Sequence, residues 1–134
     1  MKCILTGALA ALLSACAALD FGGRRLNRSP EIHAAEGSVK FSEIGGDDTG
    51  IELRVKNLKD PEEMSPPGYT YVAWVRSTPY DPPHNVGALD LNEDLSGVLK
   101  AETPLRRFEF FVTAEPTSDA AEPTGRRLLW ASRE

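Results

Sequence analysis

The sequence predicts an all-β protein, a single antiparallel immunoglobulin-like β-sandwich of about seven strands. Three observations predict this fold. Apolar residues recur at a period of two rather than 3.6, Gly- and Pro-rich breakers separate the short apolar runs, and no segment has the long amphipathic pattern of a helix. Seven short strands with such spacing are typical of a sandwich.

Two segments are the clearest strands. Ile51, Leu53 and Val55 alternate with charged residues, so three aliphatic side chains should share a core face. The segment 69–76 is rich in Tyr, Val and Trp and carries no charge before Arg76, which predicts a central strand covered on both sides. The other expected strands are 38–42, 86–91, 97–102, 108–114 and 127–131.

Turn residues predict how some of these strands connect. Gly45-Gly46 and Asp47-Asp48 favour a solvated hairpin turn, with a weak cation site as the alternative. A single helical turn is expected over 60–65, because Asp60 can cap it and Pro61 suits its first position.

The run Asp90-Leu91-Asn92-Glu93-Asp94 opens like a calcium loop, with oxygen ligands at alternate positions. An EF-hand requires Gly at its sixth position and a bidentate Glu at its twelfth, but these positions hold Leu95 and Ala101. We therefore expect a hairpin turn between the strands 86–91 and 97–102.

The strand 108–114 should present aromatic side chains on both faces. Alternation places Phe108 and Phe110 on one face and Phe111 on the other. The first face is expected to lie in the core, and the second is either covered by a loop or offered to a partner.

The N-terminus has the pattern of a bacterial lipoprotein signal peptide, or lipobox. Lys2 precedes a short apolar run that closes with Leu13-Ser14-Ala15-Cys16. A membrane span needs roughly 20 apolar residues, whereas a shorter run ending in small residues is typical of a secretory signal. We expect residues 1–15 to be the signal peptide, with Leu13, Ser14 and Ala15 recognised by the signal peptidase and Cys16 acylated.

Acylation of Cys16 would make the lipid bilayer the first partner of this protein. Two or more acyl chains give durable attachment. Ala17 rather than Asp at the next position resembles the outer-membrane class of Gram-negative lipoproteins, which predicts the periplasmic side of the outer membrane if the organism is Gram-negative. Loss of Cys3 and modification of Cys16 would leave no thiol for a disulfide or a cysteine zinc site.

The mature chain is expected to have two parts. Residues 16–35 are predicted to be the lipidated cysteine and a flexible tether, because this stretch holds two glycines, three arginines and a proline with little apolar periodicity. Residues 36–134 are predicted to be the β-sandwich domain. Removing 1–15 takes away only one charged residue, Lys2, so the net charge of −5 becomes −6. This acidic balance argues against a nucleic-acid partner.

No constellation of residues indicates catalysis. The two histidines, His33 and His84, fall in different predicted loops, and no serine lies in a G-x-S-x-G setting. The pair Glu62-Glu63 is adjacent in a surface turn, where carboxylates stay solvated. We expect a non-enzymatic protein with no catalytic residue, metal or cofactor.

Several segments resemble the extracytoplasmic C-terminal domain of the anti-sigma-K factor family. The resemblance is carried by Tyr71-Val72-Ala73-Trp74-Val75, Val86-Gly87-Ala88-Leu89, Val112-Thr113-Ala114-Glu115-Pro116 and Pro123-Thr124-Gly125. It implies an adaptor or sensor module outside the cytoplasm. Family members also have a cytoplasmic sigma-binding region and a membrane helix, and we expect neither of these in this protein.

The hypothesis that these patterns favour is a membrane-anchored envelope lipoprotein. Its sandwich would bind an envelope protein through edge strands or the proline-rich loops 61–68 and 79–84. One alternative is an extracytoplasmic sensor or regulatory accessory related to anti-sigma systems. The other is a small hydrolase that uses His84 and the Glu62-Glu63 pair.

Overall fold

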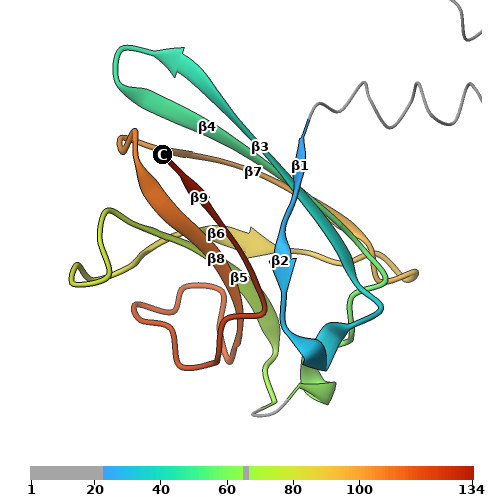
Figure 1. The fold of residues 1–134 in the computed structure, drawn as a ribbon. Helices are drawn as coiled ribbons and strands as arrows, with labels where there is room; N and C mark the ends of the chain where they lie inside the picture. Colours follow the sequence, from blue (N-terminus) through green and yellow to red (C-terminus); the bar gives the residue numbers. More distant parts are fainter. Residues whose placement is uncertain (1–22, 65–66) are drawn as a thin grey trace, which may run out of the picture.

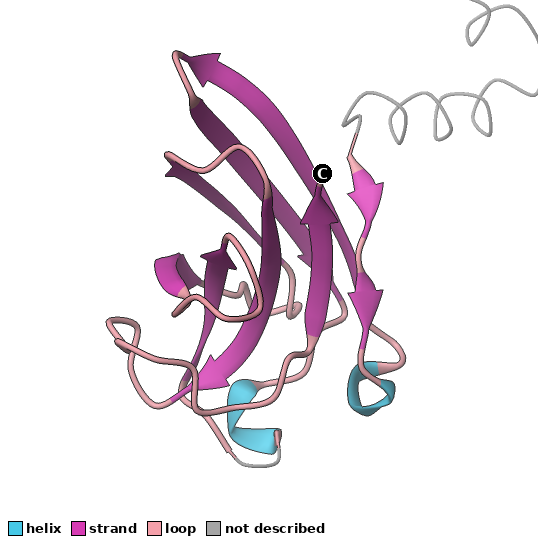
Figure 2. Ribbon diagram, turned by 60° about the vertical axis from the view of Figure 1, so that its left-hand side comes forward, coloured by secondary structure: helices cyan, strands magenta, loops and turns pink. Residues whose placement is uncertain are grey.

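The computed structural model describes residues 23–64 and 67–134, which form two antiparallel β-sheets packed face to face (Figures 1 and 2). The four-stranded sheet has the order β1-β3-β4-β7, and the five-stranded sheet has the order β2-β9-β8-β5-β6. The predicted β-sandwich is therefore confirmed. The strands are β1 (Arg24–Arg25), β2 (Asn27–Arg28), β3 (Glu36–Gly45), β4 (Asp48–Lys56), β5 (Thr70–Arg76), β6 (His84–Leu89), β7 (Gly97–Thr103), β8 (Phe108–Glu115) and β9 (Leu129–Arg133).

Each of the seven predicted strands corresponds to one of these, from β3 to β9. On β4 the alternating residues Ile51, Leu53 and Val55 are buried, as their period of two requires. β5 pairs with β6 on one side and with β8 on the other, and its central residues 71–75 are all buried. The prediction of a central strand covered on both sides is confirmed.

The core lies between the two sheets, and a smaller apolar cluster lies on the outer face of the five-stranded sheet. Phe108 and Phe110 belong to the core, whereas Phe111 packs with Val72 and Trp74 in the outer cluster. The predicted division of these aromatics between two faces is confirmed. The connection between β8 and β9, residues 116–128, covers the outer cluster, and we call it the β8–β9 loop.

The structure corrects the boundary between tether and domain. We predicted a flexible tether up to residue 35, but β1 pairs with β3 and β2 pairs with β9. Between and after these short strands, Leu26, Ile32 and Ala35 are at most 4% exposed in the core. The segment therefore joins both sheets and closes one side of the sandwich. In the part of the chain that the structure describes, the domain therefore includes the residues from Arg24 onward and does not start at residue 36.

The predicted hairpin between segments 86–91 and 97–102 is wrong. β6 pairs with β5 in one sheet and β7 pairs with β4 in the other, so residues 90–96 cross between the sheets. A tight turn does occur there, because the amide of Asn92 donates to the carbonyl of Ser96 at 2.7 Å. Alternation shows which face of each strand is apolar, but both strands face one shared core and their pattern does not select a partner strand.

The other two predicted turns are confirmed. β3 and β4 form a hairpin that closes at the pair Gly45 and Asp48, with Gly46 at a φ of 54° that glycine adopts without strain. Pro61–Glu63 forms a single 3₁₀ turn, and the side chain of Asp60 caps it by accepting from the amide of Glu62 at 3.1 Å. Pro61–Glu63 is the second 3₁₀ turn of the described chain, because a first one spans Pro30–Ile32. Across residues 23–64 and 67–134 no helix is long and apolar enough to cross a membrane.

Candidate functional site

A buried carboxylate ties the β8–β9 loop to the sheet that it covers. Glu115, the last residue of β8, is 0% exposed. Its side chain accepts hydrogen bonds from the amide of Thr124 at 2.9 Å, the hydroxyl of Thr124 at 2.7 Å and the amide of Gly125 at 3.3 Å. The hydroxyl of Thr113 donates to the same carboxylate. These contacts satisfy an acidic group that would be costly to bury alone.

The same network reaches the buried tryptophan of the central strand. The indole Nε1 of Trp74 donates to the hydroxyl of Thr113 at 2.9 Å. The loop lies so close to β8 that a Cβ on Gly125 would be only 2.6 Å from the carbonyl oxygen of Ala114. The β8–β9 loop is thus fixed by its hydrogen bonds to Glu115 and by Ala120, which packs against the outer cluster.

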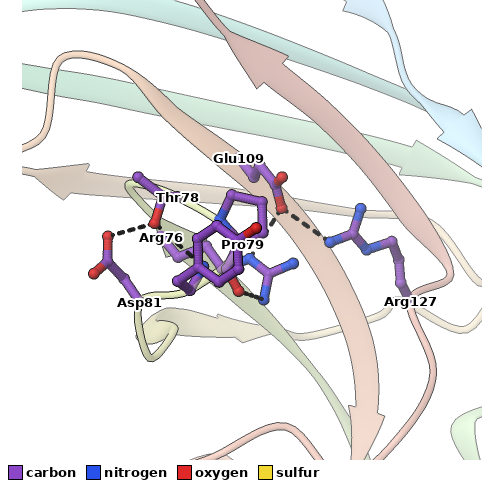
Figure 3. Close-up of polar contacts among 7 residues, drawn as sticks. Arg76, Thr78, Pro79, Asp81, Glu109 and Arg127 are labelled. Carbon is purple, nitrogen blue, oxygen red and sulfur yellow. Dashed lines mark hydrogen bonds and ion pairs between the residues drawn. The ribbon is translucent and has the colours of Figure 1, made fainter.

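One carboxylate joins two arginines, of which one, Arg127, belongs to the β8–β9 loop (Figure 3). The Oε1 atom of Glu109 lies 3.0 Å from Nε of Arg76 and 3.0 Å from Nη2 of Arg127. Both guanidinium groups also lie over Phe111, with Cζ to ring-centroid distances of 5.5 and 4.8 Å. Such stacking and pairing hold Arg76 and Arg127 in fixed positions.

The electrostatics of this cluster favour the charged form of Glu109. Burial alone would raise the pKa of Glu109, but hydrogen bonds and charge from Arg76 and Arg127 outweigh it and lower the pKa of this carboxyl below its usual range. The Glu109 carboxylate therefore stays ionised at neutral pH and holds Arg76 at the end of β5.

Arg76 in turn supports the connection between β5 and β6, residues 77–83, which we call the Tyr80 loop. Its Nη1 donates to the carbonyl of Pro79 at 3.5 Å. Within the loop, the hydroxyl of Thr78 donates to Asp81 at 3.0 Å and accepts from the amide of Tyr80 at 3.2 Å. The amide of Asp81 donates to the carbonyl of Thr78 at 3.1 Å. These bonds connect the residues of the loop to one another (Figure 3), and its three prolines restrict its backbone.

Tyr80 is presented to solvent by this loop. It is 95% exposed, more than any other large apolar residue in the described part of the chain. Tyr69, before β5, is 76% exposed, and Val98 on β7 is 54% exposed. Large aromatic side chains contribute much of the binding energy at protein interfaces, and this one is carried by a loop with its own hydrogen bonds. Tyr80 and its loop are the candidate binding site.

The residues considered for catalysis or metal binding from the sequence lie in separate elements of the structure. His33 follows the first 3₁₀ turn and His84 begins β6, whereas Glu62 and Glu63 lie in the second 3₁₀ turn, and all four are exposed. In residues 23–64 and 67–134, no three His, Cys, Asp or Glu side chains gather as metal ligands.

The two acidic segments considered from the sequence as cation sites, 90–94 and 45–48, form turns in which their carboxylates accept hydrogen bonds or pair with arginine. Asp94 accepts from the amide and hydroxyl of Ser96 at 3.3 and 2.7 Å. Asp47 pairs with Arg106 at 3.3 Å. The residues of the predicted lipobox, Leu13, Ser14, Ala15 and Cys16, lie outside the described residues.

Tyr71 illustrates a buried hydroxyl with a structural role. Its hydroxyl donates to the carbonyl of Lys59 at 2.6 Å. Burial first, and then the charges of Asp60, Glu31 and Glu63, raise the pKa of Tyr71 far above its usual range. The hydroxyl therefore stays protonated and holds the second 3₁₀ turn against β5.

Comparison of the chain with models of known protein families gave no match, and neither did comparison with characterised proteins. The resemblance to the anti-sigma-K domain therefore stays a prediction. Three of the residues that carry this resemblance, Glu115, Thr124 and Gly125, form the hydrogen bonds that tie the β8–β9 loop to β8.

The sequence indicated part of this site. The stretch 79–84 was predicted to be a possible binding loop because it is rich in proline, with Pro79 and Pro82-Pro83. The sequence did not predict that Tyr80 is the exposed side chain of this loop, nor that Arg76, Glu109 and Arg127 form a cluster beside it. Pattern reasoning finds a loop, but contacts between distant residues decide which side chain the loop presents.

Proposed function

We propose that this protein is a non-enzymatic binding module of the bacterial cell envelope, anchored in the membrane through acylated Cys16. The observation that carries the binding role is Tyr80, held 95% exposed on a hydrogen-bonded loop. Tyrosine is enriched among the residues that dominate binding energy at protein interfaces. A loop already ordered before binding also loses little conformational entropy when the partner arrives. A protein partner with a pocket for an aromatic ring fits this site.

The length of the anchor limits where that partner lies. The sandwich begins at Arg24, eight residues after Cys16. A fully extended chain covers at most about 3.6 Å per residue, so this spacer reaches no further than about 30 Å. A tether extending to residue 35 would have reached more than twice as far. The Tyr80 loop would therefore meet partners that are themselves in, or close to, the same membrane.

Replacing Tyr80 tests the binding role. In co-purification from detergent-solubilised envelope, Tyr80→Ala should lower the recovery of the partner by about tenfold or more, because truncating a central aromatic costs about 2 kcal/mol or more of binding energy. The fold should be unaffected, since the side chain contributes almost no buried area.

The matched control is Tyr69→Ala, which removes the second exposed tyrosine, at 76% exposure, outside the Tyr80 loop. It should leave recovery of the partner at the wild-type level. Equal recovery with wild type, Tyr69→Ala and Tyr80→Ala, or no partner with any of them, would contradict the assignment of the Tyr80 loop.

A further inference from the structure

β7 is an open edge of the four-stranded sheet. It pairs with β4 over seven consecutive positions with no bulge, and no strand of the described chain pairs with its other side. Val98, on its outward face, is 54% exposed. Such an edge presents a row of backbone N–H and C=O groups to any further strand.

The other edges of the sandwich are less suited to pairing. β1 and β2 have two residues each. β6 is interrupted by a register shift beside Gly87, which has a φ of 143°, and the side chain of Asn85 is bonded to the β8–β9 loop. Bulges of this kind protect an edge. The outer side of β3 beyond Val39 is also unpaired, but a register shift between Glu43 and Gly45 interrupts that strand. Among the described strands, β7 is the long edge without a bulge.

We propose that β7 pairs antiparallel with β7 of a second copy of this chain, about a two-fold axis at Ala101. In this register Lys100 lies opposite Glu102 of the second copy, and symmetry repeats the pair. Because side chains alternate along a strand, Lys100 and Glu102 share the exposed outer face of the sheet. Directly opposed residues have Cβ atoms about 5 Å apart, so two ion pairs would form across the junction.

Charge selects this register over its neighbours. A shift of one residue would place outward side chains opposite inward ones, so the next allowed registers differ by two. One of these puts Lys100 opposite Lys100, and the other puts Glu102 opposite Glu102. Edge strands often carry a lysine that discourages pairing, but here one register matches that lysine with an acid.

The contacts within one copy leave Glu102 available for this pairing. On β4, the residue opposite Lys100 is Glu52, whereas the residue opposite Glu102 is Gly50. No side chain on β4 therefore faces Glu102. On the inner face, the small side chain of Ala101 sits at the axis, which lets the two strands approach.

A charge swap tests the proposal, with the purified full chain in nonionic detergent studied by sedimentation velocity over a range of protein concentrations. Lys100→Glu alone and Glu102→Lys alone each place like charges opposite one another twice, and each should weaken dimerisation about tenfold. The double variant Lys100→Glu with Glu102→Lys restores both opposite-charge pairs and should dimerise like the wild type.

The swap also separates pairing from other effects. Lys100→Glu places an acid opposite Glu52 in both the single and the double variant, so only the contact between copies differs. If two copies associated only because their lipid anchors share one detergent micelle, the dimer fraction would be the same in the wild type, the two single variants and the double variant. A monomeric wild type, or a dimer that is insensitive to the single changes or not restored by the double change, would overturn the proposal.

Discussion

Glu115→Ala is expected to lower the free energy of unfolding by about 4 kcal/mol, the largest effect of any single change considered for this protein. The substitution removes an acceptor that binds the hydroxyl of Thr113 and three groups of Thr124 and Gly125. Each buried donor left unpaired costs about 1 to 3 kcal/mol, and part of this cost is relieved when the loop opens to water. Denaturant unfolding followed by tryptophan fluorescence measures the loss.

Two further variants separate the network from the loop as a whole. Glu122→Ala changes an exposed acid in the same loop and should shift stability by less than about 0.5 kcal/mol. Glu115→Gln keeps the shape but presents an amide group to donors, so its effect should lie between the two. A Glu115→Ala protein as stable as Glu122→Ala would show that the buried carboxylate does not hold the loop.

Ile32→Ala is expected to cost about 3 kcal/mol of unfolding free energy, as is usual for truncating a buried isoleucine. Ile32 is 2% exposed and packs in the main core. This change tests the position of the domain boundary, because a residue in a flexible tether would contribute nothing to stability. Thermal or denaturant unfolding measures it.

The control is the next residue, His33→Ala, which is exposed and should change stability by less than about 0.5 kcal/mol. If Ile32→Ala and His33→Ala are equally stable, the segment before β3 does not belong to the folded unit, and the short spacer inferred from it would have to be lengthened.

The strands were predictable because burial on one face imposes a period of two on the sequence. Ile51, Leu53 and Val55 on β4 are an example. The N-terminal strands escaped prediction because two residues are too few to show alternation, and Arg24–Arg25 and Asn27–Arg28 are polar and exposed. Their place is set by the single buried residue between them, Leu26, which no local pattern singles out.

The candidate site was less predictable than the strands. Arg76, Glu109 and Arg127 come from three separate parts of the chain, and only the pairing of β5 with β8 brings the first two together. The Tyr80 loop contacts this cluster through the bond from Arg76 to the carbonyl of Pro79. Similarly, the sequence singled out Glu115 only as part of the anti-sigma-K resemblance, whereas in the structure its carboxylate accepts the hydrogen bonds that fix the β8–β9 loop.

Our central claim, a binding domain held close to a bacterial membrane, is tested most directly by mass spectrometry of this protein from fractionated cells. We expect the wild type in the membrane fraction, beginning at Cys16 and carrying a diacylglyceryl group on its thiol, and Cys16→Ala to lack the modification. Unmodified Cys16 in an uncleaved chain in the soluble fraction would contradict the claim.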